Sequence, residues 1–255
     1  DGSGTVWLRS NNNLLRMTKG GRYFESASKT PQAYDLSLLF LGPKGEIYLP
    51  SREGLWIHDP KQQSWRNVGV ANGLAAEPIT AILGDHEENL WIGFFGLGLM
   101  RWLGYEEWEG WTPQEGLNSG TVWTLMRDSR HTLWAGTDNG INYFDEGSQR
   151  WRSLGGEPGK SIGRIMSMTA DGPNVFWASS QNRGLVRVDS AAKSYAVLGF
   201  PKQSAAHQLF NVVLDRDSRL WLGTNNGVYQ ARSSAPLDWI AAEIKRSEEV
   251  EMLYT

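Results

Sequence analysis

Residues 121–155 read TVWTLMRDSRHTLWAGTDNGINYFDEGSQRWRSLG, and they contain four short apolar segments separated by turn-forming residues. The predicted strands are Val122–Met126, a segment around Trp134, Ile141–Phe144 and a segment around Trp151. The Asp128 loop separates the first two strands, and Thr137–Gly140 predicts a tight hairpin with Asn-Gly in left-handed positions. Four short strands joined by turns indicate one small antiparallel sheet.

The same pattern occurs six times along the chain. Its anchoring aromatic residues are Trp7, Tyr48, Trp91, Trp134, Trp177 and Trp221. Consecutive anchors are 41 to 44 residues apart. A period of about 40–45 residues with four strands is typical of a β-propeller blade. We therefore predict an all-β fold in which residues 1–255 form a single β-propeller segment of six four-stranded repeats.

An aspartate precedes the anchor by six residues in most repeats. These residues are Asp1, Asp85, Asp128, Asp171 and Asp215, and Gly42 replaces Asp in the second repeat. An Asp at the start of a turn accepts hydrogen bonds from backbone N–H groups two residues on, so we expect a structural role. A metal or ligand role is the alternative, but five equivalent turns would hardly all be sites. The anchor Trp residues are expected in the core rather than as platforms for ligands.

The first repeat begins just before its second strand, so we expect five complete blades and one that lacks its first strand. The chain starts at Asp1 rather than Met, and we expect the natural N-terminus to lie outside it. The last repeat carries an insertion at 233–250. A short helix starting near Ser234 and Pro236 is predicted there.

Composition excludes several function classes. The net charge is −3 without a long basic run, which argues against nucleic acid or an anionic membrane as a partner. The absence of Cys excludes disulfides and thiolate zinc sites. No zincin, dinucleotide-binding or nucleophile-elbow motif is present, and the four His residues fall in different repeats. We expect no metal, no cofactor and no catalytic residue in this segment.

The pattern D-x5-W-[ILA]-G-T-x-x-G-[LIV] is clearest at Asp128–Ile141 and Asp215–Val228. Together with the connection Trp111–Leu125, it resembles the two-component regulator propeller repeat over nearly the whole chain. The resemblance implies a seven-bladed ring, often one of two in tandem, outside the cytoplasmic membrane. It also implies a membrane helix and a cytoplasmic histidine kinase or diguanylate cyclase elsewhere in the parent chain. The first, second and fifth repeats lack the Gly-Thr pair of the pattern.

We call the four strands of a blade a to d. The b–c loops and d–a connections of a propeller open on one end, here called the b–c end, where ligands bind in many propellers. The candidate ligand-binding residues there are Phe94, Phe95, Asn118, Asp138, Asn139, Arg164, Asn182, Arg183, His207, Asn225 and Asn226. Amides, Arg and aromatic rings suit a small saccharide or peptide. Alternatively, the Asn residues of Asn-Gly pairs serve type I′ turns. No turn requires Phe94, Phe95 or Arg183.

The leading hypothesis is an extracytoplasmic, periplasmic ligand-sensing propeller of a bacterial membrane signalling receptor, without enzymatic activity of its own. Expected partners are neighbouring propeller or receptor domains and a second receptor copy, with membrane contact made through other parts of the parent chain. A free-standing lyase or hydrolase, similar to the streptogramin lyases, is the second hypothesis. His207 is its best residue, because no other His lies in a loop at the b–c end. A protein-binding scaffold is the third.

Overall fold

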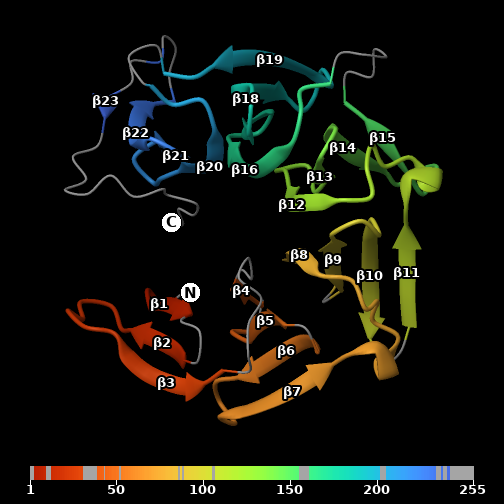
Figure 1. Cartoon of the computed structure of the whole chain (residues 1–255), viewed down its shortest axis with the longest axis vertical. Coiled ribbons are helices and arrows are strands. Elements are labelled where there is room, and N and C mark those ends of the chain that lie inside the picture. The colour runs from red at the N-terminus through yellow and green to blue at the C-terminus, as the bar shows by residue number, and fades with distance from the viewer. Residues whose placement is uncertain are drawn as a thin grey trace. The chain divides into compact units, whose positions relative to one another are not determined.

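The computed structural model describes residues 3–9, 13–30, 39–42, 44–51, 53–85, 87, 89–104, 107–154, 161–201, 205–233, 237 and 240–241. These residues form 23 strands and two short 3-10 helices (Figure 1). The chain divides into two compact units, Asp1–Gly110 and Trp111–Thr255, and each is described separately.

The first unit contains three antiparallel sheets, each in sequential strand order. The first sheet has three strands: β1 (Val6–Arg9), β2 (Asn13–Met17) and β3 (Glu25–Lys29). The second is formed by β4 (Phe40–Leu41), β5 (Ile47–Ser51), β6 (Gly54–Asp59) and β7 (Ser64–Val68). The third is formed by β8 (Ile79–Gly84), β9 (Leu90–Phe94), β10 (Leu99–Gly104) and β11 (Glu107–Trp111). A 3-10 helix, η1 (Val70–Asn72), follows β7.

The second unit starts with the 3-10 helix η2 (Pro113–Glu115) and contains three four-stranded sheets. The fourth blade is β12 (Val122–Arg127), β13 (Leu133–Thr137), β14 (Gly140–Asp145) and β15 (Arg150–Ser153). The fifth is β16 (Ile165–Asp171), β17 (Val175–Ser180), β18 (Gly184–Asp189) and β19 (Ser194–Gly199). The sixth is β20 (Leu209–Leu214), β21 (Arg219–Thr224), β22 (Gly227–Arg232) and β23 (Ile240–Ala241). The described residues therefore form the six blades of an all-β propeller fold, and the first blade contains three described strands, which correspond to the predicted strands b to d.

Most of the insertion at 233–250 lies outside the described residues, as does the Ser234–Pro236 start of the predicted helix. Within the insertion, Ile240–Ala241 form β23 and pair with Gln230 and Tyr229 of β22. These two residues are extended rather than helical.

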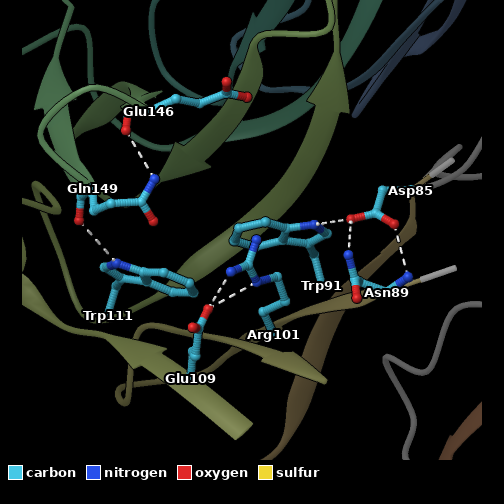
Figure 2. Close-up of polar contacts among 8 residues, drawn as sticks. All are labelled: Asp85, Asn89, Trp91, Arg101, Glu109, Trp111, Glu146 and Gln149. Carbon is cyan, nitrogen blue, oxygen red and sulfur yellow. Dashed lines mark hydrogen bonds and ion pairs between the residues drawn. The ribbon is translucent and has the colours of Figure 1, made fainter. Parts of the chain in front are cut away.

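In the third to sixth blades, the aspartate before the anchor binds the indole of that anchor. The indole Nε1 donates to Oδ2 at 2.9 Å in Asp85–Trp91 and Asp128–Trp134, 2.7 Å in Asp171–Trp177 and 2.8 Å in Asp215–Trp221. We call these the Asp–Trp pairs, and Figure 2 shows the first of them. The predicted turn contacts are also present: Asp128 Oδ1 accepts from the N–H groups of Arg130 and Thr132, both at 2.9 Å. The sequence predicted the turn contact and missed the indole contact.

The expected geometry of the b–c hairpins is wrong in one respect. In Thr137–Gly140, Gly140 has a φ of 117°, but Asp138 and Asn139 have negative φ. The Thr137 hydroxyl closes the turn, because it accepts from Asn139 N–H at 3.2 Å and donates to the Gly140 carbonyl at 3.0 Å. The Asn of the Asn-Gly pair is therefore not required by a type I′ turn.

The Gly-Thr pair of the repeat pattern is explained by the same hairpins. Ser51 of the second blade makes the two contacts that Thr137 makes, so the hydroxyl is retained where Gly-Thr is lost. Gly136 is required by packing, because a Cβ there would lie 2.5 Å from Thr124 Cγ2 and 2.7 Å from Ile165 Cγ2. Ile165 belongs to the next blade, so this glycine allows two neighbouring blades to approach closely.

Candidate ligand-binding site

The b–c end of the second unit brings the predicted polar residues together. Strands β12, β16 and β20 lie side by side, so the loops at their ends are neighbours. The b–c loops contribute residues 138–139, 181–183 and 225–226, and the d–a connections contribute Asn118, Arg164 and His207.

Arg164, Asp138 and Trp123 form the best-defined polar cluster at this end, and we call them the Arg164 cluster. Arg164 Nε donates to Asp138 Oδ1 at 2.6 Å, and Trp123 Nε1 donates to the same oxygen at 2.8 Å. The guanidinium carbon of Arg164 lies 4.9 Å from the centroid of the Trp123 ring, which is a cation–π distance. The Arg164 and Asp138 side chains are 39% and 30% exposed, so ligands in solvent can reach both.

The backbone around Arg164 is also fixed. Its carbonyl accepts from Gln181 N–H at 2.9 Å, and the Gln181 carbonyl accepts from Leu209 N–H at 2.9 Å. These two hydrogen bonds join the segment between the fourth and fifth blades, the b–c loop of the fifth blade and the start of β20. Arg164 is therefore held by three neighbouring parts of the second unit.

Asn118 and Asn139 bind each other reciprocally across the b–c end of the fourth blade. Asn139 Nδ2 donates to the Asn118 carbonyl at 3.2 Å, and Asn118 Nδ2 donates to the Asn139 carbonyl at 3.4 Å. Asn142, which is fully buried on β14, accepts from Asn118 N–H at 3.1 Å and donates to the Gly116 carbonyl at 3.1 Å. The d–a connection is thus attached to the b–c hairpin beside Asp138.

Asn225 plays the corresponding part in the sixth blade. Its Oδ1 accepts from the backbone N–H groups of His207 and Gln208, both at 3.1 Å, which fixes the orientation of the amide. Its Nδ2 therefore faces the His207 ring, 3.0 Å from Nδ1 and 3.2 Å from Nε2. Asn226 is exposed, and its N–H donates to Thr224 Oγ1 at 3.1 Å.

The remaining candidates are dispersed. The prediction that Phe94 is exposed is wrong, because the residue is 0% exposed and lies in the core of the first unit, at the end of β9. Phe95, in the same loop, is 51% exposed, and its N–H donates to the Pro78 carbonyl. Asn182 and Arg183 are exposed in the b–c loop of the fifth blade.

The pKa shift near this end belongs to Glu115, a residue that supports the connection before the fourth blade. Side-chain and backbone hydrogen bonds from Thr112 lower the pKa of Glu115, which closes η2 with Thr112 as its N-cap. Glu115 Oε2 accepts from the Thr112 N–H at 2.8 Å and from its hydroxyl at 2.7 Å. Helix η2 and the amide contacts around Gly116 thus fix the connection that carries Asn118.

The groups gathered at this end are charged, amide and aromatic side chains. In the part of the chain that the structure describes, no three His, Cys, Asp or Glu residues are grouped as metal ligands. The His207 ring contacts the Asn225 amide, and no carboxylate of the described residues is bonded to it. The Arg164 cluster offers charged and aromatic groups without a nucleophile.

Sequence reasoning missed Trp123, Asn142 and Thr137. Trp123 could have been found by aligning the repeats, because the matching positions on β8, β16 and β20 hold Thr80, Met166 and Phe210. Asp138 is likewise the one carboxylate at its position in the repeat. Departure from the repeat was the available signal.

The fold defines the chain as a β-propeller, and residues 116–139 match the family described as two component regulator propeller. This match confirms the resemblance inferred from the sequence, and the matched segment contains Asn118, Trp123, Asp138 and Asn139. No curated protein matches the chain.

Several solved structures have a similar fold. The extracellular domain of the putative hybrid two component system BT4673 from B. thetaiotaomicron has a TM-score of 0.74 at 14% identity, and that of BT3049 from the same organism has 0.72 at 16%. The matches cover 98% and 96% of this chain but 36% and 34% of those domains, so the chain spans about a third of their length. Virginiamycin B lyase from Staphylococcus aureus has a TM-score of 0.76 at 14% identity, with 98% and 84% coverage. In the described residues, no helix is long and apolar enough to span a membrane.

Proposed function

We propose that this chain is a ligand-sensing propeller of a bacterial membrane signalling receptor, and that the ligand binds at the b–c end of the second unit. The observation that carries the proposal is the Arg164 cluster. It places a charged pair and an aromatic ring at the end of the blades where propellers bind ligands, and the other described blades do not repeat it. The family match and the two extracellular domains support a sensor of the two-component type.

The receptor context follows from the same support. We place the propeller on the periplasmic side, in a receptor whose output is a histidine kinase or a diguanylate cyclase. Its partners are a neighbouring propeller or receptor domain and a second receptor copy. Ligand binding would shift the equilibrium between receptor states through its different affinity for each state. Sequencing the gene on both sides of this segment tests this context, and a parent gene without a membrane span or signalling output would contradict it.

The ligand is a small saccharide or peptide. Asn118 and Asn139 offer amide groups beside Asp138, and such groups bind hydroxyls and peptide N–H groups. Isothermal titration of the purified chain against neutral and acidic oligosaccharides and short peptides should identify a ligand. Asp138→Asn should weaken its affinity at least about tenfold, because the Asp positions Arg164.

The matched control is Asp145→Asn. Asp145 pairs with Arg152 Nε at 3.2 Å on the same blade, and it lies at the opposite end of β14 from Asp138. This variant should leave affinity unchanged. Failure of the whole panel to bind, or equal effects of the two variants, would contradict a binding site at the b–c end.

The lyase-type propeller is the second candidate, favoured by the likeness to virginiamycin B lyase. His207 is the residue that would serve it, and its ring contacts Asn225. Turnover of virginiamycin B that is lost in His207→Ala and kept in Asp138→Asn would favour the enzyme over the sensor.

A further inference from the structure

We infer that the b–c end of the second unit recognises a carboxylate, and that Arg164 is the residue that binds it; this inference rests on the proposed function. The ligand would carry one carboxylate next to hydroxyl or N–H groups. A uronic acid saccharide and a peptide with a free C-terminus both present this chemistry.

Arg164 is held in place without using its whole guanidinium group. Its Nε is bonded to Asp138 and its plane is packed near the Trp123 ring. The two Nη groups make no hydrogen bond within the part of the chain that the structure describes. They form the end-on edge of the guanidinium, whose parallel N–H groups match the two oxygens of a carboxylate.

Another arginine shows what a purely structural arrangement looks like. Arg101 of β10 lies 4.9 Å from the Trp91 ring centroid, the same distance as in the Arg164 cluster. It donates both Nε and Nη2 to one oxygen of Glu109 (Figure 2). Its side chain is 22% exposed, against 39% for Arg164. Arg164 is therefore more accessible and binds its carboxylate partner through Nε alone.

The charge of the cluster favours a single carboxylate over a phosphate. Asp138 already balances the charge of Arg164, so the pair is neutral overall. For a dianionic phosphate the repulsion from Asp138 and the attraction to Arg164 both double, so the neutral pair gives it no net electrostatic advantage over a carboxylate. A carboxylate gains the two charge-assisted hydrogen bonds at a smaller desolvation cost, because it carries one charge instead of two.

The neighbouring amides define the rest of the ligand. Asn118 and Asn139 use their Nδ2 groups to bind each other's backbone, and their Oδ1 atoms accept no hydrogen bond from described residues. Amide oxygens accept from hydroxyl or N–H donors. Asn139 follows Asp138 directly in sequence, and Asn118 is bonded to the loop that contains Asp138. The ligand should therefore present donors beside its carboxylate.

The test uses matched acid and neutral probes with the whole chain. One pair is galacturonate and galactose, and the other is N-acetyl-trialanine and N-acetyl-trialanine amide. Binding is followed by titration calorimetry and by the 15N signal of the Trp123 indole, assigned with Trp123→Phe. The acid of one pair should bind at least about tenfold more tightly than its neutral partner and shift this signal. The pair that shows the preference identifies the source of the carboxylate.

Arginine variants then test the fork, which is the pair of parallel Nη groups of Arg164. Arg164→Gln should reduce the affinity for the acid to that for the neutral probe, and Arg164→Lys should recover only part of it, because Lys lacks the fork. Arg152→Gln is the matched control, since Arg152 also bonds an aspartate through Nε but lies on β15. It should leave the preference unchanged. The melting temperature of every variant is measured, so that a loss of fold is recognised.

The outcomes separate this inference from the proposed function. Equal binding of acid and neutral probes, or an acid preference that survives Arg164→Gln, would overturn the carboxylate inference. If a neutral saccharide or peptide then shifts the Trp123 signal, the sensor proposal stands without it. If no probe or panel compound of either charge shifts that signal, both fail.

Discussion

The fourth blade contains two carboxylate–indole hydrogen bonds, one at each end, and they serve different purposes. At one end, Asp128 and Trp134 are 7% and 0% exposed, and both Asp128 oxygens accept hydrogen bonds from the blade itself. At the other end, Asp138 is 30% exposed and holds Trp123 together with Arg164 of the next blade. The first pair recurs in four blades, whereas the second is found in one. A contact that is repeated in several blades indicates a structural need of the blade, whereas a contact found in one blade indicates a role of that blade alone.

The largest expected effect is at the repeated pair. Asp128→Ala should lower the free energy of unfolding by about 3 kcal/mol, because it leaves the N–H groups of Arg130, Thr132 and Trp134 without their acceptor. Asp138→Ala should cost about 1 kcal/mol or less, since its ion pair is partly exposed. Urea unfolding of both variants measures the difference. Equal losses would remove the distinction between the two ends.

The second effect tests close packing between blades. Gly136→Ala should destabilise the fold by about 2 kcal/mol, because its Cβ would meet Thr124 and Ile165 within 2.7 Å. Gly147→Ala is the control, since its Cβ would come no closer than 3.5 Å to Asp145 Oδ1. Thermal unfolding should show a lower melting temperature for Gly136→Ala alone. A wild-type melting temperature would mean that the two blades can separate locally at no cost.

A smaller effect is expected at the hairpin. Thr137→Val should cost about 1 kcal/mol, because it removes the hydroxyl that accepts from Asn139 and donates to Gly140. Thr137→Ser should recover most of the stability, as Ser51 does in the second blade. Chemical unfolding of the two variants provides the measurement. A Val variant as stable as the Ser variant would show that the turn is fixed by Gly140 alone.

The smallest effect is the pH dependence of a partly buried Asp–Trp pair, Asp215–Trp221. The hydrogen bond from the Trp221 indole, followed by backbone N–H groups, lowers the pKa of Asp215 below its ordinary 3.8. A carboxyl group with a lowered pKa stabilises the fold fully above its unfolded pKa, and the contribution is lost as the pH falls through the folded pKa. Wild type should therefore lose stability more steeply than Asp215→Asn as the pH falls below about 4. Identical pH profiles would contradict the shift.

The fold was readable from the sequence because each blade repeats the same local rules. The anchor spacing, the Asp of the a–b turn and the glycine after the b–c hairpin all act within one blade, so their pattern survives in sequence. The Asp–Trp contact was missed although its spacing of six residues is constant, because spacing alone does not show that two side chains face each other.

The site was only partly readable. Asp138 and Arg164 were predicted from their loop positions, but their contact joins two blades across 26 residues and could not be foreseen. Phe94 was placed in a loop, yet it is the last residue of β9, as Thr137 is of β13, and it packs inward. Trp123 was counted as an ordinary strand residue, and its role depends on the cation and carboxylate that the fold brings beside it.

The most direct test measures stability and binding together in Asp128→Asn and Asp138→Asn. The ligand is the one identified by titration of the saccharide and peptide panel. Asp128→Asn should lower the melting temperature and keep the affinity of the folded protein. Asp138→Asn should keep the melting temperature and lose at least about tenfold in affinity. If Asp138→Asn instead unfolds like Asp128→Asn, or binds the ligand like wild type, the Arg164 cluster is one more structural contact and the proposed site is wrong.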